Sequence, residues 1–145
     1  MSSPNTPSAP RVEFRETIPS TRDEIDRVLE ACLAGLQRCG HDETAEFAIR
    51  LAMEESLANA MNHGNGGDSS KTIRVEFDVA PGFFRAVVED QGPGFNPDTV
   101  PDPTAEENLT VASGRGLTLI RAFMTEVTVV APGNRLEMTY VRPGE

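Results

Sequence analysis

The chain has 145 residues, the length of a single domain that can bury a core of its own. With 38% hydrophobic and 25% charged residues it has the composition of an ordinary globular protein, which argues against membrane-spanning, collagen-like and largely disordered chains. Thirteen basic residues against 23 acidic ones give a net charge of −10, a field that would repel a phosphate backbone, so we expect no direct nucleic-acid binding.

Three further features limit which classes of protein are possible: the single lysine, the two cysteines and the N-terminal segment. Lys71 is the only lysine, and its neighbours match neither a P-loop nor the lysine strand of ordinary protein kinases. Cys32 and Cys39 lie on one predicted helix without C-x-x-C spacing, so we expect reduced thiols, no zinc site and a cytoplasmic protein. Residues 1–10 are rich in Ser and Pro without an apolar segment, which predicts a disordered tail before one domain over 11–145 and no membrane contact.

Hydrophobic periodicity and turn residues predict the elements in chain order. They are a strand at 12–18, a helix opened by a capping signature at 20–24 and ended by Gly40, a second helix from 42 to about 63, a hairpin of strands at 73–79 and 84–88, a helix from 116, and a final hairpin at 127–140 that turns at 132–134. Because the strands come as hairpins and not as β-α-β units, we expect an α+β two-layer sandwich. A mainly antiparallel, mixed sheet is covered on one face by three helices.

Two of the predicted connections between helices and strands differ in length and composition. Residues 64–70 are rich in Gly and Ser, which indicates a flexible connection. Residues 91–114 contain four prolines and four acids but no basic residue. Unstructured segments of this length are uncommon in compact domains and are usually functional.

The second predicted helix carries polar side chains on one side. Glu55, Asn59 and His63 are four residues apart and therefore share one side of it. A carboxylate and a carboxamide can hold Mg²⁺ together with phosphate and water, or Glu55 can act as a general base. The alternative is a solvated polar stripe.

The strand ending at Glu89 is followed by Asp90-Gln91-Gly92-Pro93-Gly94. An aspartate at a strand end can accept a hydrogen bond from an exocyclic amine, and glycines let the backbone approach a flat base. An ordinary Gly-Pro turn is the alternative.

Ser113-Gly114-Arg115-Gly116 opens the third predicted helix. Free backbone N–H groups and the helix dipole favour an anion there, and Arg115 and Arg121 could add charge-assisted hydrogen bonds. The alternative is a glycine-rich cap with solvated arginines.

Together these segments resemble the motifs of the Bergerat-fold ATPases, the superfamily of gyrase, chaperone, histidine-kinase and MutL domains. Residues 55–60 resemble the N box, 90–95 the first glycine box and 114–117 the second, and the match spans about 11–142. Within the superfamily, 114–127 is most similar to the anti-sigma-factor serine/threonine kinases of bacterial partner-switching systems.

The resemblance implies ATP and Mg²⁺ as ligands and gives roles to individual residues. It makes Glu55 the base for the phosphoryl acceptor, Asn59 the Mg²⁺ ligand and Asp90 the contact to the adenine amino group, with Gly92 and Gly94 shaping the base pocket. The four-residue step to Asn59 favours Glu55 over its neighbour Glu54 as the base, because Glu54 points about 100° away around the helix.

For the phosphates, the resemblance implies contacts with the amides around Gly114 and Gly116 and with Arg115, beneath a lid formed by residues 95–113. In the final hairpin turn the family often has Gly-Thr, where the threonine helps frame the nucleotide. This chain has Gly133-Asn134 at that point.

The resemblance therefore implies an ATP-dependent serine/threonine kinase that sequesters a sigma factor and phosphorylates its antagonist protein, with homodimerisation common in the family. One alternative is a nucleotide-binding module that holds a protein partner with little or no kinase activity. A detached histidine-kinase domain is a more distant one, because neither His41 nor His63 lies in a dimerisation helix of the phosphoacceptor type.

Overall fold

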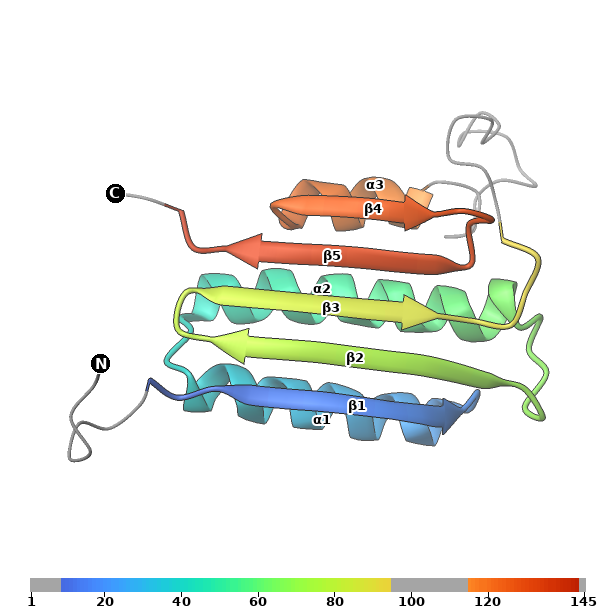
Figure 1. Cartoon of the computed structure of the whole chain (residues 1–145), viewed down its shortest axis with the longest axis horizontal. Coiled ribbons are helices and arrows are strands. Elements are labelled where there is room, and N and C mark those ends of the chain that lie inside the picture. Colours follow the sequence, from blue (N-terminus) through green and yellow to red (C-terminus); the bar gives the residue numbers. More distant parts are fainter. Residues whose placement is uncertain (1–8, 95–114, 144–145) are drawn as a thin grey trace, which may run out of the picture.

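A computed structural model describes residues 9–94 and 115–143 (Figure 1). Its elements in chain order are β1 (Val12–Pro19), α1 (Arg22–Arg38), α2 (Glu43–Asn59), the π-helix η1 (Ala60–Gly64), β2 (Thr72–Ala80), β3 (Phe83–Glu89), α3 (Arg115–Phe123), β4 (Glu126–Val130) and β5 (Arg135–Val141). The strands form one sheet in the order β1-β2-β3-β5-β4, and α1, α2 and α3 all cover the same face of it.

The two long helices begin at side-chain caps that the sequence specifies. Thr21 accepts a hydrogen bond from the Glu24 backbone N–H at the start of α1, and Asp42 accepts one from the Ala45 N–H, 2.9 Å away, at the start of α2. α2 then continues directly into η1. A π-helical turn of this kind is rare and is often found at functional sites.

The core lies between the helices and the inner face of the sheet. Alternate residues of β2, which are Ile73, Val75, Phe77 and Val79, are fully or almost fully buried. The ring of Phe77 stacks on that of Phe14 in β1, with 4.7 Å between the ring centroids.

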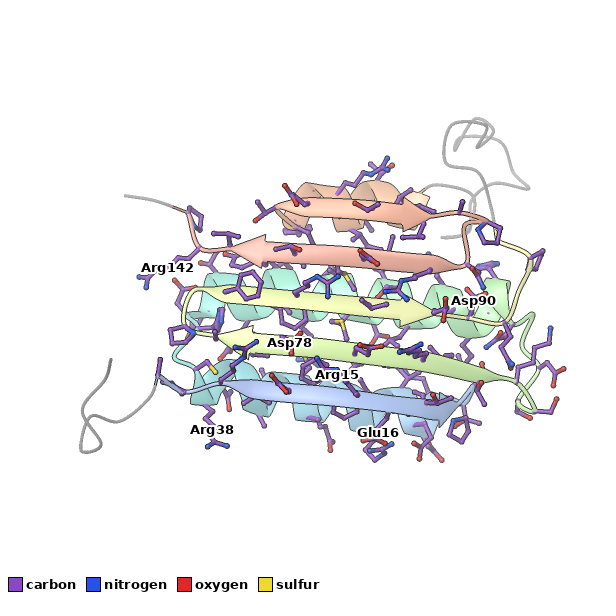
Figure 2. The ribbon with its side chains drawn as sticks, viewed as in Figure 1. Arg15, Glu16, Arg38, Asp78, Asp90 and Arg142 are labelled. Carbon is purple, nitrogen blue, oxygen red and sulfur yellow. The ribbon has the colours of Figure 1, made fainter. Side chains whose placement is uncertain are left out.

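The opposite face of the sheet is charged. Figure 2 shows Arg15 and Asp78 on this face, where the Arg15 guanidinium lies 3.5 Å from a carboxylate oxygen of Asp78 and 3.5 Å from one of Glu76. The residues between the buried ones of β2, which are Arg74, Glu76 and Asp78, are thus polar, as alternation predicts for a sheet covered on one side, whereas β3 carries the apolar Val87 on this face.

The predicted fold class is confirmed, with one difference in the sheet and one in a connection. All four strand pairings in the described part of the chain are antiparallel, so the sheet is not mixed there. The prediction of a flexible connection over 64–70 is wrong at its start, because Gly64 closes η1 and Asn65 is buried. None of the described helices combines the length and apolar character that a membrane crossing would need.

This topology brings distant segments to one end of the sheet. Glu89 at the end of β3 pairs with Arg135 at the start of β5, so the residue after β3 lies beside the β4–β5 turn. The C-terminal end of α2 and the N-terminal end of α3 reach the same end of the molecule (Figure 1).

Candidate functional site

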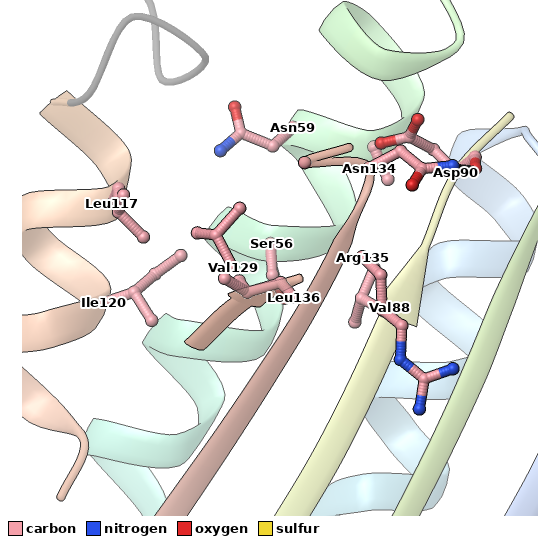
Figure 3. Close-up of a pocket in the computed structure, with 12 residues that line it drawn as sticks. Ser56, Asn59, Val88, Asp90, Leu117, Ile120, Val129, Asn134, Arg135 and Leu136 are labelled. Carbon is pink, nitrogen blue, oxygen red and sulfur yellow. Dashed lines mark hydrogen bonds between the residues drawn. The ribbon is translucent and has the colours of Figure 1, made fainter. Parts of the chain in front are cut away.

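A cavity opens where α2, α3, β3 and the β4–β5 turn meet (Figure 3). Its apolar lining comes from three directions: Leu117 and Ile120 of α3, Val129 and Leu136 of the final hairpin, and Val88 of β3. Its polar lining includes Asn59, Asp90 and Asn134. The structure therefore brings two predicted site residues, Asn59 and Asp90, to one apolar-floored cavity.

A second cavity adjoins the first and shares Asn59, Asp90 and Gly133 with it. It is also lined by His63, Gly64, Pro93 and Gly94. Asp90 thus lines both cavities. η1 contributes His63 and Gly64 to the second cavity, and the β4–β5 turn contributes Gly133 to both.

The backbone of Asp90 is held by Asn134. The Asp90 N–H donates to the Asn134 carbonyl and the Asn134 side-chain amide donates to the Asp90 carbonyl, both at 2.9 Å. The sequence predicted that Asn134 stands where the family often has a threonine that frames the nucleotide. Its amide nitrogen instead binds the protein backbone.

The Asp90 carboxylate keeps one oxygen available. Its Oδ1 accepts a hydrogen bond from the Gly92 N–H at 2.7 Å, while Oδ2 has no hydrogen-bond partner among the residues that the structure describes. Burial raises the pKa of Asp90, and the Gly92 N–H opposes that shift. Oδ2, which lies against Gly64, is therefore an acceptor that the described residues leave without a donor.

Glycines allow this close packing. A Cβ on Gly64 would collide with the Asp90 carboxylate, and one on Gly92 would collide with the Gly64 carbonyl oxygen. Gly94 has a φ of +80° and lies against the Pro132 carbonyl. Gly92 and Gly94 thus shape the surroundings of Asp90.

Asn59 presents a polar atom that the described protein does not satisfy. Its Oδ1 is buried and has no hydrogen-bond partner within 9–94 and 115–143. A buried acceptor of this kind calls for a donor or a cation, and a carboxamide oxygen is a ligand type that Mg²⁺ accepts. The described residues contain no cluster of three or more His, Cys, Asp or Glu side chains that could hold a metal, so Mg²⁺ here would depend on phosphate and water for its other ligands.

Glu54 and Glu55 have different surroundings, as their positions on the helix predicted. Both carboxylate oxygens of Glu54 accept hydrogen bonds from the Arg22 guanidinium, at 2.7 and 3.0 Å. Glu55 is half-buried and makes no hydrogen bond or ion pair with any described residue. It is also absent from the described lining of the two cavities, where Ser56 and Asn59 represent that turn of α2.

The predicted phosphate contacts are only partly described. Gly114 and the lid over 95–113 lie outside the described residues, as does the side chain of Arg115, although Arg115 is the first residue of α3. Gly116 is buried in the first turn of α3. Arg121 is exposed on the same helix.

Sequence reasoning missed Asn65, which is 1% exposed and joins three segments by hydrogen bonds. It also missed the apolar lining supplied by Leu117, Ile120 and Val129. The only signal for Asn65 was its place directly after the predicted helix, where an Asn is usually interpreted as a helix end or a turn.

Residues 18–140 match the family described as "Histidine kinase-like ATPase domain". The anti-sigma F factor of Geobacillus thermodenitrificans (strain NG80-2) is 30% identical over 104 residues, which cover 70% of this chain and 69% of that protein. The anti-sigma F factor of Geobacillus sp. (strain WCH70) is 28% identical over 126 residues, covering 85% of this chain and 84% of that protein.

A solved structure shares the fold. The crystal structure of the RsbU and RsbW domains of Rv1364c from Mycobacterium tuberculosis aligns with a TM-score of 0.61 at 22% identity. The alignment covers 90% of this chain but only 32% of that longer chain.

The buried carboxylate of Asp90 predicts a stability that depends on pH. Because burial raises its folded-state pKa, the stability linked to this group is present below the ordinary aspartate pKa and is lost as pH rises through the raised value. Asp90→Asn stays neutral and can still accept the Gly92 hydrogen bond. We expect the variant to unfold at higher urea concentration than the wild type at about pH 7, with a gap that narrows on acidification. A variant less stable than the wild type at neutral pH would contradict this account.

Proposed function

Because this chain belongs to the histidine kinase-like ATPase family, we propose that it is an ATP-binding anti-sigma factor that phosphorylates a serine or threonine of an antagonist protein. The proposal is supported by one observation above the others. Asp90, whose Oδ2 has no described partner, and Asn59, whose buried Oδ1 is unpaired among the described residues, line a single cavity with an apolar floor.

The base half of that cavity suits adenine. Adenine carries an exocyclic amino group, which would donate to Asp90 Oδ2, and a flat ring, which would be covered by apolar side chains such as Val129 and Leu136. Gly64 and Gly92 keep side chains out of the space beside the carboxylate.

The phosphate half lies towards α2 and α3. Asn59, at the end of α2, would offer its Oδ1 to Mg²⁺, which when bound neutralises phosphate charge. The first turn of α3, from Arg115 through Gly116, would offer backbone N–H groups and the positive end of its dipole to phosphate oxygens. A chain with one lysine can thus bind a nucleotide through amides, a metal and arginine.

Glu55 would act as the general base. The acceptor hydroxyl oxygen forms a bond to the γ-phosphorus, the bond from that phosphorus to the β–γ bridging oxygen breaks, and ADP leaves. The hydroxyl proton passes to the Glu55 carboxylate, which has no partner among the described residues. Glu54 is unsuited to this role because Arg22 binds both of its oxygens.

A second function is favoured by the position of Glu55, which lies outside the described lining of both cavities. In that case the domain binds ATP or ADP and holds a protein partner, with little or no phosphoryl transfer. The relatives named anti-sigma F factors support a sigma factor as that partner under either function.

Phosphoryl transfer distinguishes the two functions. With labelled ATP, Mg²⁺ and a purified candidate antagonist, the wild type should transfer label to a serine or threonine, and Glu55→Ala should reduce the rate about 100-fold or more while leaving ATP affinity unchanged. The matched control is Glu54→Ala, which removes the adjacent carboxylate and its Arg22 ion pair and should change the rate only a few-fold.

Two outcomes would contradict this assignment. Loss of transfer in Glu54→Ala but not in Glu55→Ala would show that Glu54, and not Glu55, is the base. Absence of transfer by the wild type, with ATP still bound, would favour the binding module.

Asn59 should account for the metal dependence of binding. The ATP affinity of the wild type, measured by calorimetry with Mg²⁺ and then with EDTA, should differ about tenfold, and Asn59→Ala should remove most of that difference. Ser56→Ala is the control, because Ser56 lines the same cavity but its hydroxyl donates to the Met53 carbonyl. An unchanged Mg²⁺ effect in Asn59→Ala would place the metal elsewhere.

A further inference from the structure

We propose that Asn65 is a positioning residue for base recognition: its buried carboxamide holds the turn after β3 so that Asp90 Oδ2 meets the nucleobase. The inference rests on the proposed function only in that Asp90 contacts the base. Asn65 itself lines neither of the two cavities described here and acts through the backbone that carries Asp90.

The Asn65 side chain uses both of its ends. Its Oδ1 accepts a hydrogen bond from the Gln91 N–H at 2.8 Å, and its Nδ2 donates to the Ser20 hydroxyl at 3.1 Å and to the Thr72 carbonyl at 3.0 Å. Only a carboxamide offers an acceptor and two donors in this geometry. One buried side chain thus ties the residue after Asp90 to the start of β2 and to the entry of α1.

A further hydrogen bond connects two of the partners of Asn65 to each other. The Gln91 side chain accepts a hydrogen bond from the Thr72 N–H at 2.8 Å, so Asn65, Thr72 and Gln91 are linked in pairs. The backbone of Asn65 is fixed as well, because its N–H donates to the carbonyl of Ala60, the first residue of η1.

Asn65 and Asn134 hold the Asp90 backbone from two sides. Asn134 binds the N–H and the carbonyl of Asp90 itself, and Asn65 binds the next N–H along the chain. The Gly92 N–H then fixes Oδ1, which leaves Oδ2 as the free acceptor. If Asn65 is removed, the Gln91 N–H loses its buried acceptor, and the turn has to rotate towards water to satisfy it.

Such a rotation should affect base selectivity more than general binding. Adenine presents an amino donor at the position where guanine presents a carbonyl oxygen. A fixed carboxylate oxygen attracts the adenine amino group and repels the guanine carbonyl oxygen. The selectivity for ATP over GTP therefore depends on where Asp90 Oδ2 lies. The residues proposed to bind Mg²⁺ and the phosphates, Asn59 and the first turn of α3, lie on other elements.

The test is the ratio of the Kd for GTP to the Kd for ATP, both measured by calorimetry with Mg²⁺. The wild type should prefer ATP, and Asn65→Ala should weaken ATP binding about tenfold with little effect on GTP, so that the ratio falls by a similar factor. The Gln91 amide should also exchange its hydrogen faster in the variant.

The matched control is Val79→Ala. Val79 is fully buried in β2 and pairs with Phe84, at the end of β3 that lies away from Asp90, so its truncation should destabilise the fold at least as much. We expect its nucleotide ratio to stay within about twofold of the wild type, which separates positioning from loss of stability.

Each outcome decides the proposal. An unchanged ratio in Asn65→Ala, or an equal fall in Val79→Ala, would overturn it while leaving the proposed function intact. If Asn65→Ala does not fold, Ser20→Ala removes one acceptor of the carboxamide and should lower the ratio about two- to threefold, and no change there would overturn it. A wild type without preference for ATP would instead show that Asp90 does not recognise the base.

Discussion

The half-buried carboxylate of Asp90 is the constraint around which the rest of the site is arranged. Taking a carboxylate out of water is unfavourable unless donors replace the water, and here one backbone N–H, from Gly92, does so for Oδ1. Oδ2 has no such donor among the described residues, and we propose that a ligand provides one. A partly buried charge without enough hydrogen-bond donors is typical of binding sites. It lowers the stability of the unliganded fold, and a ligand that supplies the donor binds more tightly as a result.

The fold keeps that carboxylate in place through its topology. The antiparallel pairing of β3 with β5 places the β4–β5 turn beside Asp90, and the passage of α2 into η1 places Gly64 against the carboxylate. Because neither neighbour is close in sequence, the site exists only once the sheet and the helix layer have packed. The acidic chain of net charge −10 therefore offers a nucleotide few formal positive charges and instead provides amides, an unpaired carboxamide oxygen and a helix start.

Much of the fold follows from local signals in the sequence. The alternation of Ile73, Val75, Phe77 and Val79 fixes which face of β2 is buried, and the caps at Thr21 and Asp42 fix where the long helices begin. Within the site, the helical period correctly separated Glu54 from Glu55. The convergence of Asn59 and Asp90 was implied by the family resemblance, because no local rule joins a helix end to a strand end 31 residues later.

The remaining features depend on contacts between segments far apart in the chain. Asn65 was interpreted as part of a flexible Gly-rich connection, yet its partners are Gln91, 26 residues later, and Ser20, 45 residues earlier. The hydrogen bond from Asn134 to Asp90 spans 44 residues. Carboxamides that satisfy buried backbone groups have no sequence pattern, since the same residue type is equally common in exposed turns.

The central claim is that the Asp90 carboxylate is the adenine contact of an ATP site, and calorimetric titration of Asp90→Asn with Mg²⁺-ATP tests it most directly. The neutral carboxamide should occupy the same space with the same backbone contacts. The account predicts that ATP affinity falls about 100-fold or more while the variant remains folded. An ATP affinity equal to that of the wild type would show that the nucleotide, if it binds, is recognised elsewhere.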